Sequence, residues 1–170
     1  MTRVKTRYKT LAITTNYWRP GEDPIKNIIN FIKDRVENND IVTISEKAVS
    51  TALNNILDES SVRPCLLARL LAKYWMRLIW GYLLGPLCHL KKKTTRRFRT
   101  YPLKEGSAHK QVALQRAGFL QALMHGSEGA IDGSNLPYSY VSLPLENAQQ
   151  IAQKIQDQIK AELGKKVTIL

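Results

Sequence analysis

The feature that most constrains the fold is an alternation of strand-like and helix-like segments near the start of the chain. Residues 8–15 mix β-branched and apolar side chains, which is typical of a strand, and residues 40–45 have the same character. Between them, apolar residues recur at helical spacing from Ile25 to Val36, directly after Pro24, a residue suited to a first helical turn. A strand, a helix and a second strand in this order predict a mixed α/β fold, with a mixed sheet and flanking helices.

The rest of the chain continues this alternation. We expect helices over residues 46–56 and 107–124 and a third between Pro144 and Gly164, and strands over residues 138–143 and 166–170. These elements predict a single domain over residues 1–170. The chain stops inside the last predicted strand, whose backbone needs pairing and cover, so we interpret it as a truncated domain that lacks its C-terminal half.

The positive charge is concentrated in the middle of the chain. Residues 61–110 hold twelve of the 26 Lys and Arg residues and one of the 14 acidic residues, so their net charge is +11 out of a total of +12. A block of this kind favours an anionic partner: nucleotide phosphates, nucleic acid or a membrane surface.

Apolar side chains crowd residues 66–90, where Arg69, Lys73 and Arg77 interrupt them at intervals of four. This spacing predicts an amphipathic helix with a cationic edge, broken at Gly85 and Pro86. The uninterrupted apolar run, residues 78–87, is about half the roughly 20 residues that span a bilayer. We therefore expect the apolar face to pack in the core or in a dimer interface, and the basic run that follows, residues 91–99, to be a solvated loop.

The cysteines exclude a disulfide framework. Cys65 and Cys88 are too few for one, so a reducing compartment fits best, and the charged N-terminus is not a signal peptide. We expect a cytoplasmic protein. With His89 and His109 the cysteines lack the spacing of a zinc site, so buried thiols are expected.

Four segments, in order, carry a family resemblance: PGED (Pro20–Asp23), NDIVTISEKAVS (Asn39–Ser50), GAIDGSNLP (Gly129–Pro137) and the strand–proline–helix–strand over Tyr138–Leu170. In them the chain resembles the N-terminal part of the coenzyme F420-0:γ-glutamyl ligase family. The third segment is similar to the family's GID-x-SN loop and is the most specific. Residues 61–110 match the family pattern poorly and resemble a basic amphipathic insertion of a divergent subgroup.

The resemblance implies a two-step ligation. GTP phosphorylates a carboxylate of a coenzyme F420-type substrate, and the amino group of L-glutamate attacks the acyl phosphate to form an amide bond. Magnesium or manganese holds the phosphates, and members are cytosolic homodimers. The sequence does not specify the acceptor, and it identifies no catalytic residue.

The resemblance also implies roles for individual residues. It makes Asp132 a metal ligand, because a carboxylate suits a hard cation. Without the resemblance, the residues around Asp132 favour an Asx-turn role over a metal ligand. The residues implied to contact the nucleotide are Ser45, Glu46, Lys47, Ser134 and Asn135.

Two departures from the family pattern bear on activity. Thr51 stands where many members have a further lysine. The family's second metal-binding segment follows the strand that begins here at Lys166, about where the chain stops. Asp132 alone leaves a metal short of its usual six oxygen ligands, so we expect this polypeptide to be inactive by itself.

Two weaker predictions concern the basic segment. His109 and Lys110 are expected at a helix start, where free N–H groups favour phosphate; the alternative is an ordinary exposed first turn. The rival function is a non-catalytic anion-binding module that uses residues 61–110 to bind RNA or an acidic membrane surface. No DNA partner is expected, and membrane contact is expected less than packing within the protein.

Overall fold

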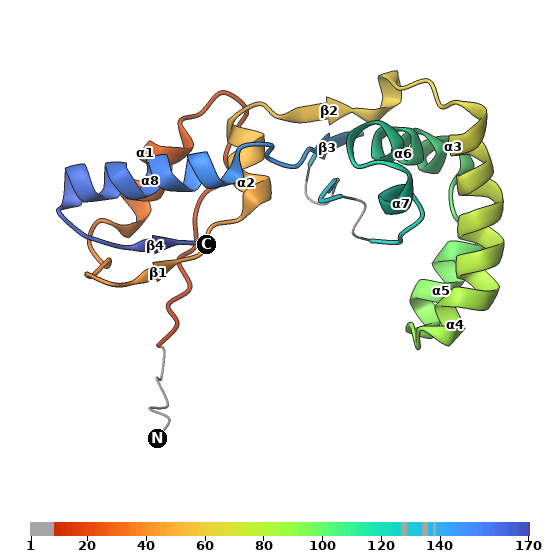
Figure 1. Ribbon diagram of the computed structural model, residues 1–170, viewed down its shortest axis with the longest axis horizontal. Coiled ribbons are helices and arrows are strands. Elements are labelled where there is room, and N and C mark those ends of the chain that lie inside the picture. Colours follow the sequence, from red (N-terminus) through yellow and green to blue (C-terminus); the bar gives the residue numbers. More distant parts are fainter. Residues whose placement is uncertain (1–8, 127–128, 134–135, 138) are drawn as a thin grey trace. The chain divides into compact units, whose positions relative to one another are not determined.

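The computed structural model describes residues 9–126, 129–133, 136–137 and 139–170 of the chain. Its architecture is mixed α/β, as the sequence predicts, with helices and short paired strands (Figure 1). The chain forms two compact units, one of the residues up to Leu53 together with Asn147–Leu170, the other of Asn54–Glu146. Each unit has its own helices and its own pair of strands. A single domain over residues 1–170 stays a prediction.

In the first unit, two strands pair in parallel, with Ile41 opposite Thr168 and Val42 opposite Ile169. Helices α1 and α8 contact each other, and α8 also contacts β4. Both helices bury isoleucines at helical spacing, and the buried ones are Ile28, Ile29 and Ile32 on α1 and Ile155 and Ile159 on α8. The elements of this unit are α1 (Pro24–Ile32), β1 (Ile41–Val42), α2 (Glu46–Ala52), α8 (Ala148–Leu163) and β4 (Thr168–Ile169).

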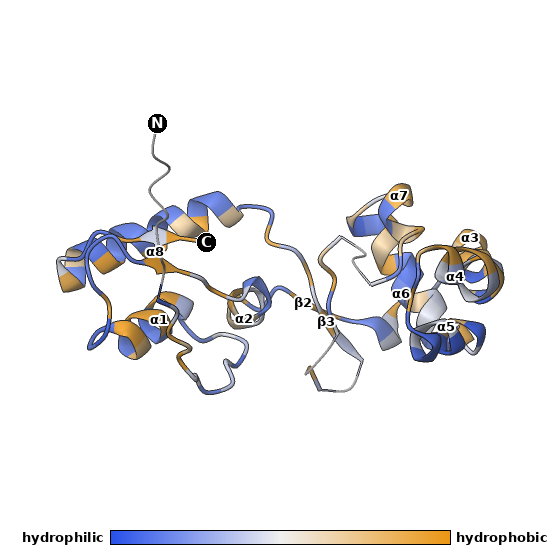
Figure 2. Ribbon diagram, turned by 90° about the horizontal axis from the view of Figure 1, so that it is seen from below, coloured by the Kyte–Doolittle hydropathy of each residue, from blue (hydrophilic) through white to orange (hydrophobic). Residues whose placement is uncertain are grey.

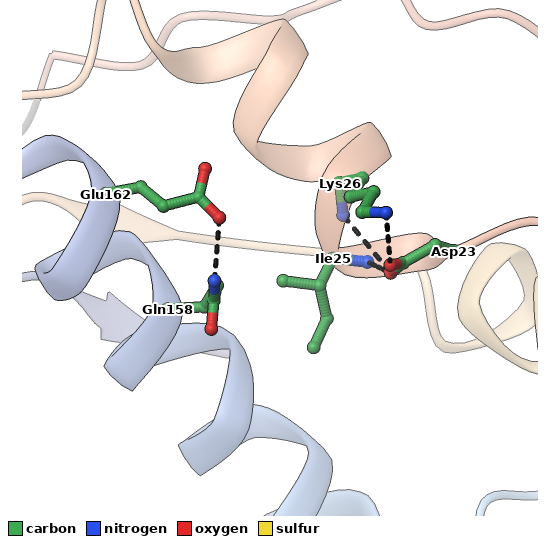
Figure 3. A network of polar contacts seen from close by, with 5 residues as sticks. All are labelled: Asp23, Ile25, Lys26, Gln158 and Glu162. Atoms are coloured by element: carbon green, nitrogen blue, oxygen red, sulfur yellow. Dashed lines mark hydrogen bonds and ion pairs between the residues drawn. The ribbon is translucent and has the colours of Figure 1, made fainter.

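Local chemistry sets the start of α1 and the end of α8. The Asp23 carboxylate accepts hydrogen bonds from the N–H groups of Ile25 and Lys26, at 3.0 and 3.3 Å, so it caps the first turn of α1 (Figure 3). Helix α8 ends at Gly164, whose φ of 65° is left-handed and suits glycine. The sequence predicts both boundaries, and the structure confirms them.

The second unit contains an antiparallel pair of strands and a set of helices. Leu57 lies opposite Val141 in this pair. The buried apolar core is formed by Leu71, Val112, Ala113, Ala122, Ile131, Val141 and Leu143. The elements are β2 (Ile56–Asp58), η1 (Glu59–Ser61), α3 (Leu66–Leu70), η2 (Leu71–Leu84), α4 (Gly85–Leu87), α5 (Lys92–Arg99), α6 (Leu103–Arg116), α7 (Phe119–Ala122) and β3 (Tyr140–Ser142).

A long helical segment runs through α3, η2 and α4 and confirms the predicted amphipathic helix. The break predicted at Gly85 and Pro86 is wrong, because both residues lie inside α4. Ala68, Ala72, Met76 and Trp80, four residues apart, are buried. In η2 the hydrogen bonds follow the wider π-helical pattern, as at its end, where the N–H of Gly85 donates to the carbonyl of Trp80. No helix in the described part of the chain combines the length and apolar character needed to cross a bilayer.

The strands are shorter than the sequence predicts. Residues 9–15 form no strand. Of their two large apolar residues, Leu11 is 61% exposed and Ile13 is half-buried, so burial does little to stabilise an extended conformation there. Among the described residues, the strands form two separate pairs, β1 with β4 and β2 with β3, in place of one mixed sheet.

Three further predictions for the second unit are wrong. The basic run of residues 91–99 is not a loop, because Lys92–Arg99 form helix α5: α5 packs on η2, and Arg99 Nε donates to the carbonyl of Gly81 at 2.9 Å. The helix predicted over residues 107–124 begins earlier and is divided into α6 and α7 at Gly118, whose φ is +87°. Cys65 and Cys88 are exposed and not buried.

Candidate functional site

The turn that the resemblance assigns to the nucleotide follows β1 and opens α2. Ser45 is exposed and precedes Glu46, the first residue of α2, while Lys47 is half-buried. Beside this turn, the N–H of Ile44 donates to the carbonyl of Leu170 at 2.9 Å. Because β1 and β4 are parallel, the turn lies at the edge formed by the carboxyl ends of both strands, which is where ligands bind in parallel α/β sheets.

Asp132 lies on an extended segment that pairs with β3. Its N–H donates to the carbonyl of Ser142 at 3.2 Å, and its own carbonyl accepts from the N–H and the Oγ of Ser142 at 3.0 and 3.1 Å. The preceding residue, Ile131, is buried in the core, and successive side chains of an extended segment point to opposite faces. The half-buried side chain of Asp132 is therefore directed away from that core, and its backbone belongs to a β-bridge.

The remaining loop residues, Ser134 and Asn135, lie outside the described residues. Within the described ranges, no three His, Cys, Asp or Glu side chains gather in a group that could hold a metal ion. A hard divalent cation takes about six oxygen ligands. Asp132 would supply one of them, so the described residues do not by themselves complete a metal site.

Three side-chain donors fix the chain just before the glycine-rich loop. The Nε1 groups of Trp75 and Trp80 both donate to the carbonyl of Leu123, at 2.7 and 2.8 Å. Lys110 Nζ donates to the carbonyl of Met124 at 2.9 Å. Carbonyls at the end of a helix lack partners within that helix. These donors therefore cap α7 and anchor the start of the loop.

The expected position of His109 and Lys110 is wrong. Helix α6 begins at Leu103, so both residues lie within the helix, where the backbone N–H groups are already bonded. Lys110 is fully buried, and its ammonium donates a hydrogen bond to the carbonyl of Met124. His109 Nδ1 lies 2.5 Å from Glu59 Oε1. Phosphate binding by either side chain stays a prediction.

Asp58 is held by a contact between segments that are distant in sequence. Its carboxylate accepts hydrogen bonds from the hydroxyl of Ser139, 81 residues away, and from the N–H of Ser60 at 2.8 Å. These bonds, the one from Ser139 foremost, keep the pKa of Asp58 below its usual 3.8, because they stabilise the charged form. No sequence pattern pointed to this pair.

A groove of about 870 Å³ in the second unit is a feature that sequence reasoning missed. Residues from η1, α3, η2, α6 and β3 line it, among them Arg69, Lys73 and Lys104. Helical spacing singles out Arg69 and Lys73 as a cationic edge, but only the fold brings Lys104 to the same groove. Gly133, which follows Asp132, also lines it.

Comparison with known proteins identifies the family. The model of the family described as F420-0:Gamma-glutamyl ligase matches residues 12–170. The chain belongs to the F420-0:γ-glutamyl ligase family. It is also similar to an uncharacterized protein of Methanocaldococcus jannaschii, with 36% identity over 165 residues, 95% of this chain and 56% of that protein. The chain therefore spans about half the length of the curated relative it matches.

Thr51 is the position at which the resemblance implies a further lysine in many members of the γ-glutamyl ligase family. Thr51 is buried, and its hydroxyl donates to the carbonyl of Lys47 at 2.8 Å, inside α2. The hydroxyl of Thr51 is thus used within its own helix.

The basic segment 61–110 lies inside the part of the chain that the ligase family model matches. The alignment with the archaeal relative covers 95% of the chain, so it takes in most of this segment as well. That the segment is an insertion relative to the wider family stays a prediction.

Proposed function

We propose that this chain forms part of a GTP- and divalent-metal-dependent ligase that adds L-glutamate, through an amide bond, to a carboxylate of a coenzyme F420-type substrate. The observation that carries the proposal is the family match over residues 12–170, which includes the loop of Asp132. Magnesium or manganese as the metal, a homodimer and a cytoplasmic location are parts of the same proposal.

The proposed reaction has two steps. An oxygen of the acceptor carboxylate forms a bond to the γ-phosphorus of GTP, and GDP leaves. The amino group of glutamate then attacks the carbon of the acyl phosphate, phosphate leaves, and the nitrogen gives up a proton as the amide forms. A divalent cation offsets the charge of the triphosphate when it is bound.

Two observations support the proposed residue roles, each within its own unit. In the first unit, Ser45, Glu46 and Lys47 follow a strand at the carboxyl edge of a parallel pair, and the ammonium of Lys47 suits a phosphate. In the second, the alternation from buried Ile131 directs Asp132 away from the core. We assign Lys47 to phosphate binding and Asp132 to metal binding.

Binding of a fluorescent GTP analogue with and without Mn²⁺ tests the proposal. Asp132→Asn keeps the shape of the side chain and removes its charge, and Asp34→Asn makes the same change at an exposed position outside the proposed site. We expect Asp132→Asn to weaken Mn²⁺-dependent binding about tenfold or more, since losing a charged partner costs about 1.5–3 kcal/mol. Asp34→Asn should bind as the unaltered chain does. Equal binding by both variants would contradict the metal-ligand role.

One observation favours the rival function, a non-catalytic anion-binding module. Helix α5, largely blue in Figure 2, exposes Lys92, Lys93, Arg96 and Arg97. Such a module would bind any polyanion, with an affinity that falls steeply as salt increases. Salt-sensitive binding that Asp132→Asn leaves unchanged, without any dependence on Mn²⁺, would favour this rival over the ligase.

A further inference from the structure

The groove in the second unit has no role in the function proposed above. Its volume, about 870 Å³, is within the range of roughly 300–1,000 Å³ that is typical of small-molecule sites. Gly133 lines one part of it, so the groove borders the loop that carries Asp132. Residues from separate helices and from β3 form its walls.

Three cations from two helical segments line this groove. Arg69 and Lys73 lie one turn apart along α3 and η2, and Lys104 lies in the first turn of α6. In the described part of the chain, no ion pair joins any of the three to a carboxylate. Each can therefore interact with a bound anion without giving up an ion pair.

Two carboxylates also line the groove and offset part of this charge. Glu59 is one of them, and its Oε1 lies 2.5 Å from Nδ1 of His109. Glu105 is exposed on α6. Three cations against two carboxylates leave the lining with an excess of positive charge, which favours an anionic ligand.

The other walls of the groove are apolar. Val62 and Pro64 precede α3, Leu103 begins α6, and Ala108 and Val141 complete this part of the lining. Small-molecule sites typically combine mostly apolar walls with a few charged groups that fix the orientation of the ligand. The lining therefore suits a ligand with an apolar body and a negative group.

We propose that this groove binds an organic anion: a molecule with an aromatic or other apolar body and a carboxylate or phosphate group held by Arg69, Lys73 and Lys104. Guanidinium and ammonium groups bind both kinds of anion, and guanidinium can do so through two parallel hydrogen bonds. The proposal is independent of the ligase reaction, because it requires neither GTP nor a metal ion.

Naphthalene probes that differ in one substituent test this site. Binding of 1-naphthyl phosphate, 1-naphthoate and neutral 1-naphthol is measured by ligand-observed NMR, with EDTA and without GTP. Both anions should bind, the neutral probe should bind at least about fivefold more weakly, and the tighter anion identifies the preferred group. The triple variant Arg69→Gln/Lys73→Gln/Lys104→Gln removes three exposed cations, each worth about two- to fivefold, and should weaken binding of the anions about tenfold or more.

A matched control separates this site from the general positive charge of the segment. Lys92→Gln/Lys93→Gln/Arg96→Gln removes as many cations from the exposed face of α5, outside the groove, and should keep the affinity for both anions. The single variant Lys104→Gln changes one exposed residue and should weaken binding of the anions by the roughly two- to fivefold expected for one cation. Equal binding of 1-naphthol and the anions, or equal losses in the two triple variants, would overturn the proposal. If the chain failed to bind GTP, the organic-anion proposal for the groove would not be contradicted.

Discussion

Replacing Trp75 and Trp80 with Phe tests whether two indole groups jointly cap one carbonyl. Their Nε1 groups donate to the carbonyl of Leu123 at 2.7 and 2.8 Å. A carbonyl oxygen has two lone pairs and can accept both bonds. The stability of the second unit should therefore depend on the two tryptophans together and not independently.

The expected magnitudes follow from this shared acceptor. Each single variant loses one neutral hydrogen bond, about 1 kcal/mol, plus the packing difference between an indole and a phenyl ring. The carbonyl of Leu123 still has one indole donor in either single variant, and in the double variant it has neither. An acceptor left without a partner costs about 1–3 kcal/mol when buried, and the bonds to Leu123 are partly buried, so the low end applies. The double variant should therefore be destabilised by about 1 kcal/mol more than the sum of the singles.

Urea unfolding followed by far-UV circular dichroism measures the four free energies of this double-mutant cycle. The cycle cancels the packing losses of the single replacements and leaves the coupling between them. Trp18→Phe is the matched control: Trp18 is buried, and its Nε1 has no hydrogen-bond partner among the described residues. It should lose stability through packing alone.

Two results would refute this reasoning. Losses in the cycle that add to within about 0.5 kcal/mol would show that the carbonyl of Leu123 does not couple the two indoles. A loss in Trp18→Phe as large as that in Trp80→Phe would assign the effect to ring size and not to the hydrogen bond.

Two further predictions concern titration and backbone conformation. Because hydrogen bonds lower the pKa of Asp58 in the folded chain, its stabilising contribution is complete above pH 3.8 and is lost as the pH falls through the lowered value. Ser139→Ala should raise that pKa toward 3.8 in a ¹³C carboxyl NMR titration, and an unchanged value would exclude the hydroxyl as its cause. Gly129 and Gly164 both have left-handed φ, +69° and +65°, but of the two only Gly129 would bring an added Cβ into overlap with a neighbour, the Cβ of Ala117. Gly164→Ala should cost about 1–2 kcal/mol in urea unfolding and Gly129→Ala more, whereas equal costs would argue against the contact.

The candidate site could be predicted only where its residues are neighbours in sequence. Ser45, Glu46 and Lys47 form one turn, and Asp132 belongs to one loop, so a linear pattern suffices to name them. Their roles in binding stay predictions. The groove with Lys104 was not predictable from the same patterns, because its walls come from segments that only folding brings together.

The sequence by itself determined the mixed α/β class and the boundaries that local chemistry sets. Asp23 and Pro24 start α1, and Gly164 ends α8, because capping and left-handed φ depend on a few adjacent residues. The long helix over residues 66–87 was also predictable, because the helical spacing of its apolar residues can be read from adjacent positions in the sequence.

Only the tertiary structure decided what depends on distant segments. The basic run at residues 91–99 is helical because α5 packs on η2, and Lys110 is buried because the carbonyl of Met124 lies within its reach. The β1–β4 pair joins residues more than a hundred positions apart, whose pairing no local window contains. Burial and strand pairing are properties of contacts between segments, so the same residues carry no such information until the chain has folded.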